Sequence, residues 1–465
     1  MKILMVVYDN DSYITWFPQG LAYLASAARN AGHQVFVYQQ DVFHWPDSHL
    51  TEYLNQNDFD VVEVSVIGGY YQYHKLLSIS KAINQSKNRK NFKYTIGGHG
   101  PSPDPEYFLR KTGADIVGIG EGERTFVELM DAFCGKRSLE SVDGIAYIDT
   151  NKNFVRTKAR ELIQNIDEIP WPAYDLFDMS YYTLVRRPNI KANERAIPVL
   201  SGRGCIFQCN FCYRLDKGFR PRSAQSIIEE IKFLKEQYNI KHIIFSDELL
   251  MSSKQRTTEL CQAFIDADLN IKWDCNGRLN FADTDVLCKM KEAGCVFINY
   301  GIESLDNNTL RVMHKGLTRD MIIRGVENTL EVGISPGLNI IYGNINEPLS
   351  AIDDAVEFLL KYDDHAQLRT IRPVTPYPGS ELFTYAVEHG MIKDVADFYE
   401  NIHINSDLLS VNFTQYSDEA VYNALYKANM RLIEKYQNVQ TEKAAQICKD
   451  LYINKNALFR GFRQT

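Results

Sequence analysis

The sequence predicts an α/β protein made of two successive α/β regions and a small, mainly helical C-terminal region. Residues 1–135 alternate short strand-like segments, mostly rich in Val and Ile, with helical segments, which is typical of a parallel sheet covered on both faces. The same alternation resumes at residue 197 and gives six strand–helix units, enough for a partial (β/α)6 barrel ending at residue 389. Residues 136–196 hold few long periodic runs and predict a connector, and residues 390–465 predict a helical cap.

The elements of the first region follow from runs of Val and Ile closed by Gly or Asp. Strands are expected at Lys2–Tyr8, Gln34–Tyr38, Val61–Val66, Lys93–Ile96 and Asp115–Ile119. Helices are expected at Gly20–Asn30, Leu50–Asn55, His74–Asn84, Pro105–Lys111 and Glu123–Phe133. In such open sheets, ligands bind at the carboxyl ends of the strands.

The second region follows the same pattern, and barrel chemistry also gathers at the carboxyl ends of strands. Its strands are expected at Ile197–Leu200, His242–Phe245, Ile271–Asn276, Phe297–Tyr300, Gly337–Ile341 and Leu368–Arg372. The helices that follow them are expected at Ala224–Tyr238, Lys254–Asp266, Asp283–Glu292, Asp306–Met313 with Thr318–Val332, Ala351–Lys361 and Ser380–His389.

Composition places the chain among ordinary globular proteins, with 45% hydrophobic and 24% charged residues. No apolar run approaches the roughly 18–20 residues that span a bilayer. The apolar start, Met1–Tyr8, is too short for a signal-peptide core and predicts a buried strand. The net charge of −8 disfavours nucleic-acid binding. We therefore expect a cytoplasmic protein.

Three of the nine cysteines fall within eight residues, directly after the first barrel strand, in the spacing CxxxCxxC. They are Cys205, Cys209 and Cys212. A [4Fe–4S] cluster normally takes four thiolates, so three protein ligands leave one iron open to a small molecule. S-adenosylmethionine (SAM) can chelate such an iron through its amino and carboxylate groups. The spacing thus predicts a redox cluster that cleaves SAM.

Two other interpretations of the triad are weaker. Structural zinc takes four ligands, commonly as two pairs, and no second pair of Cys or His follows at that spacing. Three unrelated core cysteines rarely fall so close together. The six remaining cysteines are scattered and predict small buried hydrophobes rather than a disulfide framework.

The triad, the aromatic Phe211 before its last cysteine and its place after a first barrel strand resemble the radical SAM superfamily. The segments Gly301–Ser304 and Pro373–Ser380, after the fourth and sixth strands, are similar to it too. The resemblance implies an external electron donor such as flavodoxin or ferredoxin. It also implies SAM contacts from Phe211, Asp247, Arg278, Glu303 and Ser304. Each of the last four could instead be a salt-bridge residue of the barrel rim.

One turn departs from this family's pattern. The fifth strand is usually followed by a Gly-x-Pro-Gly-Glu-Thr-like sequence, but here Gly343–Pro348 reads Gly-Asn-Ile-Asn-Glu-Pro. The residues that contact adenine therefore stay open.

The first region resembles the Rossmann-like cobalamin-binding domain of B12-dependent radical SAM enzymes. The matching pieces are Phe17–Ala25, Gly32–Val35, Gly97–His99 and Gly120–Phe126. Glycine at the ligand edge lets backbone approach a bulky ligand, although ordinary tight turns also use it. A nucleotide-binding site is a rival, but the first turn lacks G-x-G-x-x-G. The resemblance implies cobalamin contacts from Tyr13, Ile14, Thr15, Trp16, Ser65, Gly97, Gly98, His99, Gly120, Glu121 and Gly122.

Many cobalamin domains supply an axial histidine from the first turn, and this chain has no histidine before His33. His33 precedes the second strand and is expected on the wrong edge of the sheet. His44, His74 and His99 follow strands on the ligand edge, where a surface or turn role is the more common use of histidine. We predict cobalamin without a protein histidine ligand.

The resemblance implies methyl transfer to an unactivated carbon of a small-molecule or peptide substrate, through a 5′-deoxyadenosyl radical and methylcobalamin. Cobalamin-dependent radical cyclisation or rearrangement is an alternative that these motifs do not separate from methylation. A non-catalytic B12 or iron–sulfur sensor is a further alternative. Methylthiolation of tRNA would need a second cysteine trio, and only Cys134 precedes Cys205. In the C-terminal region, pocket lining and plain helix core are both open for Phe398, Tyr399 and Tyr416.

Overall fold

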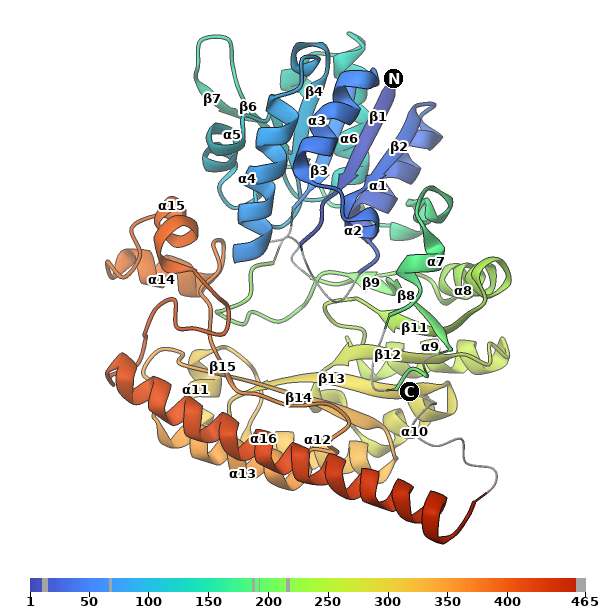
Figure 1. The fold of residues 1–465 in the computed structure, drawn as a ribbon, viewed down its shortest axis with the longest axis vertical. Helices are drawn as coiled ribbons and strands as arrows, with labels where there is room; N and C mark the ends of the chain where they lie inside the picture. The colour runs from blue at the N-terminus through green and yellow to red at the C-terminus, as the bar shows by residue number, and fades with distance from the viewer. Residues whose placement is uncertain (11–15, 67–68, 186–188, 192, 215–217, 457–465) are drawn as a thin grey trace.

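A computed structural model describes residues 1–465 except 11–15, 67–68, 186–188, 192, 215–217 and 457–465. Figure 1 shows an N-terminal α/β domain above a curved barrel sheet, with a long C-terminal helix running beneath the barrel. The expected fold class is confirmed: an open parallel sheet, a partial barrel and a helical C-terminal region.

The N-terminal sheet has seven strands in the order β2-β1-β3-β4-β5-β6-β7. The first five are parallel, and the buried Val and Ile of β1 and β3 explain why both faces must be covered. These strands are β1 (Lys2–Val7), β2 (Gln34–Gln39), β3 (Val61–Ser65), β4 (Lys93–Gly97) and β5 (Ile116–Gly118).

Helices cover the two faces of this sheet separately. α1 and α6 share one hydrophobic core with Ile3 and Met5, while α3, α4 and α5 share a second core with Leu4 and Val6. The helices are α1 (Gln19–Asn30), α2 (Gln40–Phe43), α3 (Asp47–Gln56), α4 (Tyr70–Asn84), α5 (Pro105–Thr112) and α6 (Gly122–Phe133).

The sheet continues past residue 135 into the connecting segment. β6 (Ile145–Ile148) and β7 (Phe154–Arg156) extend it as an antiparallel hairpin beside β5. The rest of the connector carries the short helix α7 (Met179–Tyr182) and packs aromatic side chains against the N-terminal domain. Tyr174, for example, stacks on Phe17 with ring centroids 5.3 Å apart.

The barrel sheet has six parallel strands in the order β15-β14-β13-β12-β11-β8. The last strand is shorter than the expected Leu368–Arg372: the backbone N–H and carbonyl of Ile371, just before it, bond the side-chain amide of Asn429 rather than another strand. The strands are β8 (Arg195–Val199), β11 (Ile240–Phe245), β12 (Lys272–Gly277), β13 (Cys295–Glu303), β14 (Ser335–Tyr342) and β15 (Arg372–Pro373).

The barrel helices pack on the outer face of this sheet. Their starts follow local capping rules: Ser223, Ser253 and Thr318 each accept a hydrogen bond from a backbone N–H of the first turn. They are α8 (Ala224–Tyr238), α9 (Lys254–Asp266), α10 (Thr284–Glu292), α11 (Asn307–Val312), α12 (Arg319–Glu331), α13 (Ser350–Tyr362) and α14 (Glu381–Glu388).

The segment after α14 joins the barrel to the N-terminal domain through α15 (Val395–Asp397) and the turn that follows it. Tyr399 stacks on Tyr73 of α4 at 4.8 Å, and Glu400 pairs with Lys111 at 2.6 Å. Phe398 and Tyr399 are buried core, whereas Tyr416 is 41% exposed. Tyr399 and Glu400 therefore connect this segment to the N-terminal domain.

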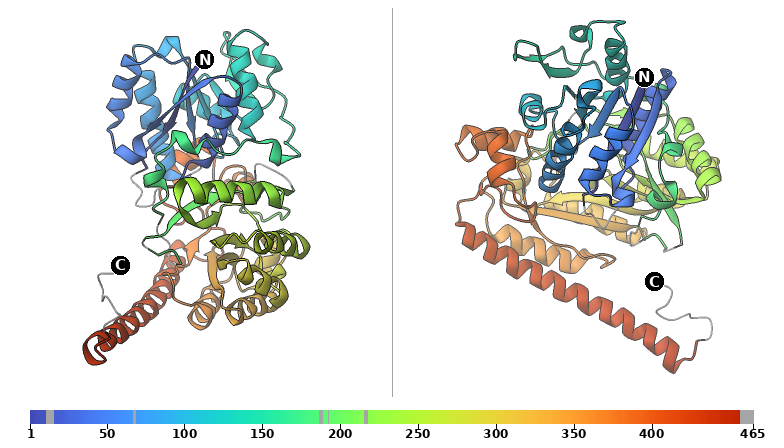
Figure 2. Two further views of the ribbon diagram at one scale, coloured as in Figure 1. Left: turned by 90° about the vertical axis from the view of Figure 1, so that its right-hand side faces the viewer. Right: turned by 45° about the horizontal axis from the view of Figure 1, so that its top comes forward.

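The last helix, α16 (Asp418–Cys448), packs along α13 through its first half, where Val421, Leu425, Ala428 and Leu432 are buried. Its second half extends beyond the barrel, as both views in Figure 2 show. Among the described residues, no helix combines the length and apolar character needed to cross a membrane.

Candidate active site

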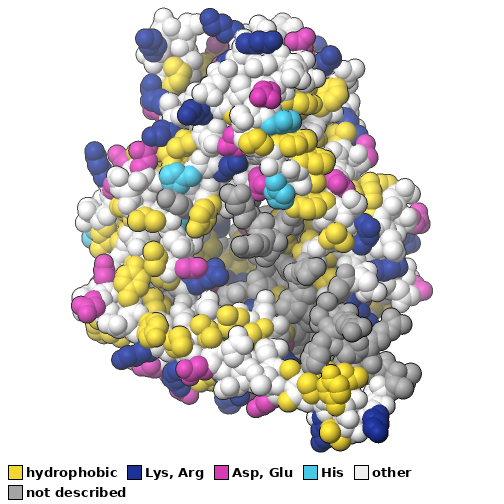
Figure 3. Space-filling view, viewed as in Figure 1, with side chains coloured by type: hydrophobic (Ala, Val, Ile, Leu, Met, Phe, Trp, Pro, Cys, Tyr) yellow, Lys and Arg dark blue, Asp and Glu magenta, His cyan; other side chains and the backbone are white. Residues whose placement is uncertain are grey.

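A cavity that opens to solvent lies where the N-terminal sheet meets the barrel, and it encloses about 1280 Å³ when its open, solvent-facing part is included. Its walls come from the carboxyl ends of β3, β4 and β5, from α1 and α6, and from barrel residues around Gly202 and Asp247. The molecular surface is hollowed at this junction (Figure 3). Two parallel sheets thus present their ligand-binding edges to one space.

The cavity collects most of the residues expected to contact a corrinoid. Trp16 is 38% exposed and is absent from the described lining, and Tyr13, Ile14 and Thr15 lie outside the described residues. The expected residues that do line the cavity are Ser65, Gly97, Gly98, His99, Gly120, Glu121 and Gly122.

Glycine is required at Gly98, and at Gly122 a larger residue would displace a neighbouring side chain. Gly98 has a φ of +102°, and a Cβ there would lie 2.5 Å from the Val66 carbonyl oxygen. At Gly122 a Cβ would lie 2.7 Å from Leu24, at the close approach of α6 to α1. The bare backbone and the size of the cavity fit a bulky ligand such as a corrinoid.

The histidines that follow strands have different surroundings. His44 bonds Asp9 at 2.5 Å, and His74 is exposed on α4. His99 lines the cavity and meets the ring of Tyr213 edge-on at 6.1 Å. His33 lies beside the backbone nitrogen of Met1, at the opposite edge of the sheet.

The cysteine loop, residues 200–213, follows β8 at the carboxyl edge of the barrel sheet. A hydrogen bond from Cys212, together with the charges of Lys315 and Arg278, lowers the pKa of Cys209 to about 6. Among the described residues, no three His, Cys, Asp or Glu side chains converge on one metal-ion position. A [4Fe–4S] cluster does not need such convergence, because each thiolate binds a different iron. Three thiols beside two cations fit this anionic cluster.

Arg278 and Lys315 form the cationic wall beside these thiols. Nη1 of Arg278 lies 3.9 Å from Sγ of Cys209, and its guanidinium carbon lies 3.4 Å from the centre of the Phe207 ring. Nη2 of Arg278 donates a hydrogen bond to the Lys315 carbonyl. Lys315 also lies 5.8 Å from the centre of the Phe211 ring.

Glu303 lies at the end of β13 in an unusual backbone conformation, with a φ of +69°. Its carboxylate accepts a 2.8 Å hydrogen bond from Nζ of Lys315. A Cβ on Gly301 would lie 2.2 Å from Oε1 of Glu303, so glycine lets this side chain cross the strand. Strained residues of this kind gather at functional sites.

The other residues expected to contact SAM are held by protein partners. Asp247 is buried and accepts hydrogen bonds from the backbone nitrogens of Ser201 at 2.6 Å and Gly202 at 3.3 Å. Burial raises the pKa of Asp247 to about 6. Ser304 donates to Glu347 at 2.8 Å. Asp247 thus anchors the start of the cysteine loop, and contact with SAM stays a prediction for Asp247 and Ser304.

The atypical turn Gly343–Pro348 is organised by Glu347, which the sequence analysis missed. Its Oε2 accepts hydrogen bonds from the backbone nitrogens of Gly343 at 2.9 Å and Asn344 at 3.1 Å. Burial raises the pKa of Glu347 to about 7. Asn344 in turn exchanges hydrogen bonds of 3.0 and 3.1 Å with Asn210 of the cysteine loop.

A ladder of asparagine amides crosses three barrel strands below this rim, and sequence periodicity alone did not single it out. Asn339 donates to Asn299 at 2.7 Å, Asn299 donates to Asn276 at 3.1 Å, and Asn276 donates to the Asp247 carbonyl at 2.7 Å. Tyr300 bonds Thr329 of the outer helix α12, so the adjacent Asn299 faces the barrel interior. The interior below the cavity is therefore polar.

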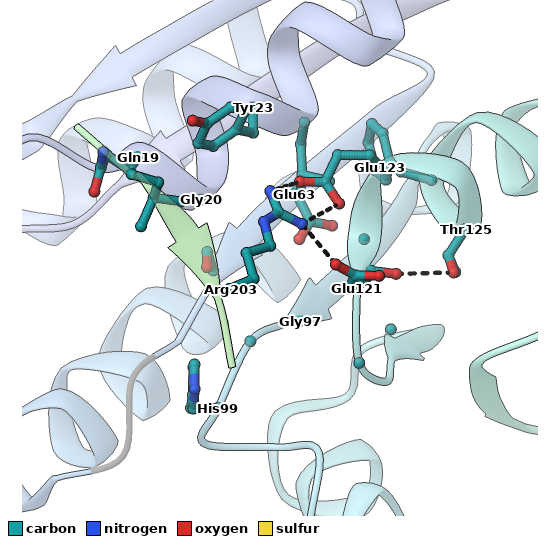
Figure 4. A pocket seen from close by; sticks show the side chains of 18 of the residues that line it. Gln19, Gly20, Tyr23, Glu63, Gly97, His99, Glu121, Glu123, Thr125 and Arg203 are labelled. Carbon is teal, nitrogen blue, oxygen red and sulfur yellow. Dashed lines mark hydrogen bonds and ion pairs between the residues drawn. The ribbon is translucent and has the colours of Figure 1, made fainter. Parts of the chain in front are cut away.

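A buried ion cluster joins the two domains at the cavity wall (Figure 4). Arg203, two residues before Cys205, pairs with Glu121 at 2.9 Å and Glu123 at 2.5 Å, and Arg220 also pairs with Glu121 at 2.9 Å. Glu121 was expected to contact cobalamin, and its carboxylate is engaged by these arginines. In the sequence, this cluster is visible only as an arginine in the cysteine loop and two acidic residues at the start of α6, which do not by themselves predict an ion pair.

Two family models match the chain. The radical SAM superfamily model covers residues 199–359, and the B12 binding domain model covers residues 5–130. The chain is 33% identical over 408 residues to an uncharacterised methyltransferase of Pyrococcus horikoshii, covering 84% of each protein. It is 25% identical over 394 residues to an anaerobic magnesium-protoporphyrin IX monomethyl ester cyclase of Rubrivivax gelatinosus, covering 82% of this chain and 68% of that protein.

Solved structures share the fold at low identity. The cobalamin-dependent SAM radical enzyme OxsB, with aqua-cobalamin bound, superimposes with a TM-score of 0.67 at 20% identity, covering 84% of this chain. This chain spans 55% of the OxsB chain. The methyltransferase TsrM of Kitasatospora setae, with cobalamin and a [4Fe–4S] cluster bound, superimposes with a TM-score of 0.67 at 18% identity, covering 83% of this chain and 75% of that one.

Proposed function

Because the chain belongs to the cobalamin-dependent radical SAM enzymes, we propose that it moves a methyl group from a corrinoid to an unactivated carbon. The substrate is a small molecule or a peptide. When bound, the cluster with SAM supplies a 5′-deoxyadenosyl radical and the corrinoid supplies the methyl group.

One observation carries this proposal: the carboxyl edges of both parallel sheets border the same cavity. The glycine turns after β4 and β5 form the side proposed for the corrinoid. The barrel side is formed by the start of the cysteine loop, at Leu200, Gly202, Arg203 and Gly204. A substrate bound between these two sides would lie between the residues that would hold the corrinoid and the loop that carries the cysteine triad, as a two-cofactor reaction requires.

The chain's own residues hold and orient the two sides. Asp247 fixes Ser201 and Gly202 by three hydrogen bonds, and Arg203 ties the same loop to Glu121 and Glu123 of the corrinoid domain. Arg278 and Lys315 place positive charge beside Cys209. The asparagine ladder gives the barrel interior hydrogen-bonding groups for a polar substrate.

Two relatives named as methyltransferases support methyl transfer as the reaction. Besides the Pyrococcus horikoshii protein, a cytidylyl-2-hydroxyethylphosphonate methyltransferase of Streptomyces wedmorensis is 22% identical over 439 residues, covering 82% of this chain and 80% of that protein. The cyclase named above keeps radical cyclisation as the second candidate reaction.

The stoichiometry of products separates these two reactions. With methyl-labelled SAM and the true substrate, methylation gives 5′-deoxyadenosine and S-adenosylhomocysteine in equal amounts, with label in the product. One SAM is cleaved and a second restores the methyl group of the corrinoid in each turnover. If 5′-deoxyadenosine forms with the substrate and no label moves, cyclisation or rearrangement replaces methylation as the proposed reaction.

We predict that the bound corrinoid carries no protein histidine on cobalt. His99 is the described histidine that borders the cavity, and its ring faces Tyr213. The electron paramagnetic resonance spectrum of the reduced Co(II) form should show no coupling to an axial nitrogen, and His99→Ala should leave that feature unchanged. A nitrogen coupling that disappears in His99→Ala would contradict the prediction.

We also propose that the enzyme works in the cytoplasm and receives electrons from flavodoxin or ferredoxin. None of the nine cysteines, all of which the structure describes, forms a disulfide, as suits a reducing compartment. Reduced flavodoxin should support 5′-deoxyadenosine formation in place of a chemical reductant, and no product above the background without flavodoxin would argue against such a donor.

A further inference from the structure

A buried ion pair lies beside the cysteine loop, apart from the ion cluster that joins the two domains. Nζ of Lys315 and Oε1 of Glu303 are 2.8 Å apart, and their side chains are 7% and 11% exposed. Such a pair contributes little net stability, because the loss of water offsets the attraction between the charges. Its place beside an anionic cofactor site therefore points to an electrostatic role.

The turn that carries Lys315 is held against the cysteine loop by hydrogen bonds to its carbonyl groups. The backbone nitrogen of Asn210, the residue after Cys209, donates to the Met313 carbonyl at 3.0 Å. Nη1 of Arg278 lies 3.9 Å from Sγ of Cys209, and Nη2 of the same guanidinium donates to the Lys315 carbonyl. These bonds fix the backbone of the turn relative to Cys209.

The backbone around the pair is unusual on both sides. His314 and Gly316, which flank Lys315, have φ values of +56° and +65°, and Glu303 has a φ of +69°. A Cβ on Gly301 would overlap Oε1 of Glu303 and would lie 2.9 Å from Nζ of Lys315. Non-glycine residues keep such conformations only where their surroundings fix them. The chain therefore reserves this space for the two charged groups.

The two charges of the pair act on different cysteines of the triad. A hydrogen bond from Cys212 and then the charge of Lys315 lower the pKa of Cys209 to about 6, against burial and a weaker effect of Glu303. At Cys212 a hydrogen bond to Cys209 and burial raise the pKa, and the charge of Glu303 exceeds that of Lys315. Lys315 thus lies on the Cys209 side of the loop, and Glu303 lies on the Cys212 side.

Reduction adds one negative charge to an iron–sulfur cluster, so a nearby cation favours the reduced state and a nearby anion opposes it. We propose that Lys315 and Glu303 form a redox-tuning pair: the buried ammonium raises the reduction potential of the cluster held by the triad, and the carboxylate orients the ammonium and lowers that potential. The electron comes from a one-electron donor such as reduced flavodoxin, and neither side chain exchanges a proton. The inference rests on the cluster that the proposed function requires, and it applies to methyl transfer and cyclisation alike.

A purely structural pair makes a different prediction. If the pair only held the loop in shape, the loss of either partner would disturb the cluster in the same way. Two charges of opposite sign instead shift the potential in opposite directions when each is removed. The sign of the two shifts therefore separates a tuning role from a structural one.

The test is a potentiometric titration of the reconstituted full-length protein at about pH 8, several units above the ordinary carboxyl pKa. The reduced cluster is followed by electron paramagnetic resonance, and SAM is left out so that its predicted contact with Glu303 does not enter. Lys315→Met should shift the reduction equilibrium roughly tenfold toward the oxidised cluster, about 59 mV for one electron. Glu303→Gln should shift it by a similar factor toward the reduced cluster. Lys315→Arg keeps the charge and should lie closer to the wild type than Lys315→Met does.

Lys272→Met is the matched control. Lys272 and Glu194 form another partly buried pair, 3.0 Å apart, and Lys272 is the first residue of β12, at the end of the barrel sheet away from the cysteine loop. Its removal should leave the potential at the wild-type value. Iron and sulfide content, together with circular dichroism, checks that each variant holds a complete cluster in a folded protein.

Two results would overturn the inference: shifts of the same sign in Lys315→Met and Glu303→Gln, and shifts no larger than that of Lys272→Met. If Lys315→Met does not retain a cluster, Glu303→Gln decides alone, because a potential at or below the wild-type value would contradict the tuning role. A wild type without any cluster would remove the assignment of the triad as well. A cyclised product from an enzyme that shows the two opposite shifts would replace the proposed reaction and leave this inference standing.

Discussion

Replacing Cys205, Cys209 and Cys212 together with alanine should abolish both the four-iron cluster and the cleavage of SAM. The triad supplies all three thiolates that the loop after β8 offers to a cluster. Without them iron has no protein ligand in the loop, and no electron reaches the sulfonium bond. Iron and sulfide content after anaerobic reconstitution, with 5′-deoxyadenosine formation under reductant, measures the effect.

Cys288→Ala is the matched control for this experiment. Cys288 is an exposed free thiol on α10, so its removal should leave iron content and SAM cleavage at wild-type levels. A triple variant that still carries a reducible four-iron cluster at full content would show that the assignment of the triad is wrong.

Replacing Arg203 with methionine should destabilise the protein by about 3–5 kcal/mol, the range observed when one partner of a buried ion pair is removed. Arg203 links the cysteine loop to Glu121 and Glu123, whose side chains are 5% and 9% exposed. The substitution leaves Glu123 buried without its closest cation. Denaturant unfolding followed by circular dichroism at neutral pH gives the free energy of unfolding.

The surface pair Arg124–Glu168 supplies the control. Its side chains are 52% and 58% exposed, so Arg124→Met should cost less than about 1 kcal/mol. Equal effects of Arg203→Met and Arg124→Met would contradict a structural role for the buried cluster.

The pH dependence of this cluster has a definite sign. Burial by itself would raise the pKa of Glu123, but Arg203 holds it below the usual 4.5. A lowered pKa in the folded state stabilises the protein above pH 4.5, and this contribution is lost as the pH falls through the folded-state pKa. The difference in stability between wild type and Arg203→Met should therefore shrink in acid.

Local sequence patterns were sufficient for the fold class and for part of the site. Alternating apolar runs and helical periods are properties of short segments, so β1 to β5 and the first five barrel strands could be predicted with small errors at their ends. The cysteine triad lies within eight residues, and the glycines follow their strands directly, so both signals survive without tertiary information.

The edges of these elements show where local reasoning weakens. The hairpin β6–β7 lies in the segment predicted as a connector. Its two strands are short and are stabilised by pairing with β5, which a local pattern does not reveal. The last barrel strand is reduced to Arg372–Pro373, and the backbone groups of Ile371 just before it bond the side chain of Asn429 on α16 instead of another strand. Such choices depend on neighbours that are distant in sequence.

Only the tertiary structure decided which polar residues pair with each other and which face the cavity. Arg203 meets Glu121 and Glu123 about eighty residues away, and Lys315 meets Glu303 across a turn with an unusual backbone. Glu63 reads as one acid within a valine-rich strand, yet the packing of α1 and α6 places it in an apolar slot. Burial and ion pairing depend on chain segments that folding brings together. The sequence motifs therefore indicate the cofactors, but not the contacts that set the pKa values of the residues around them.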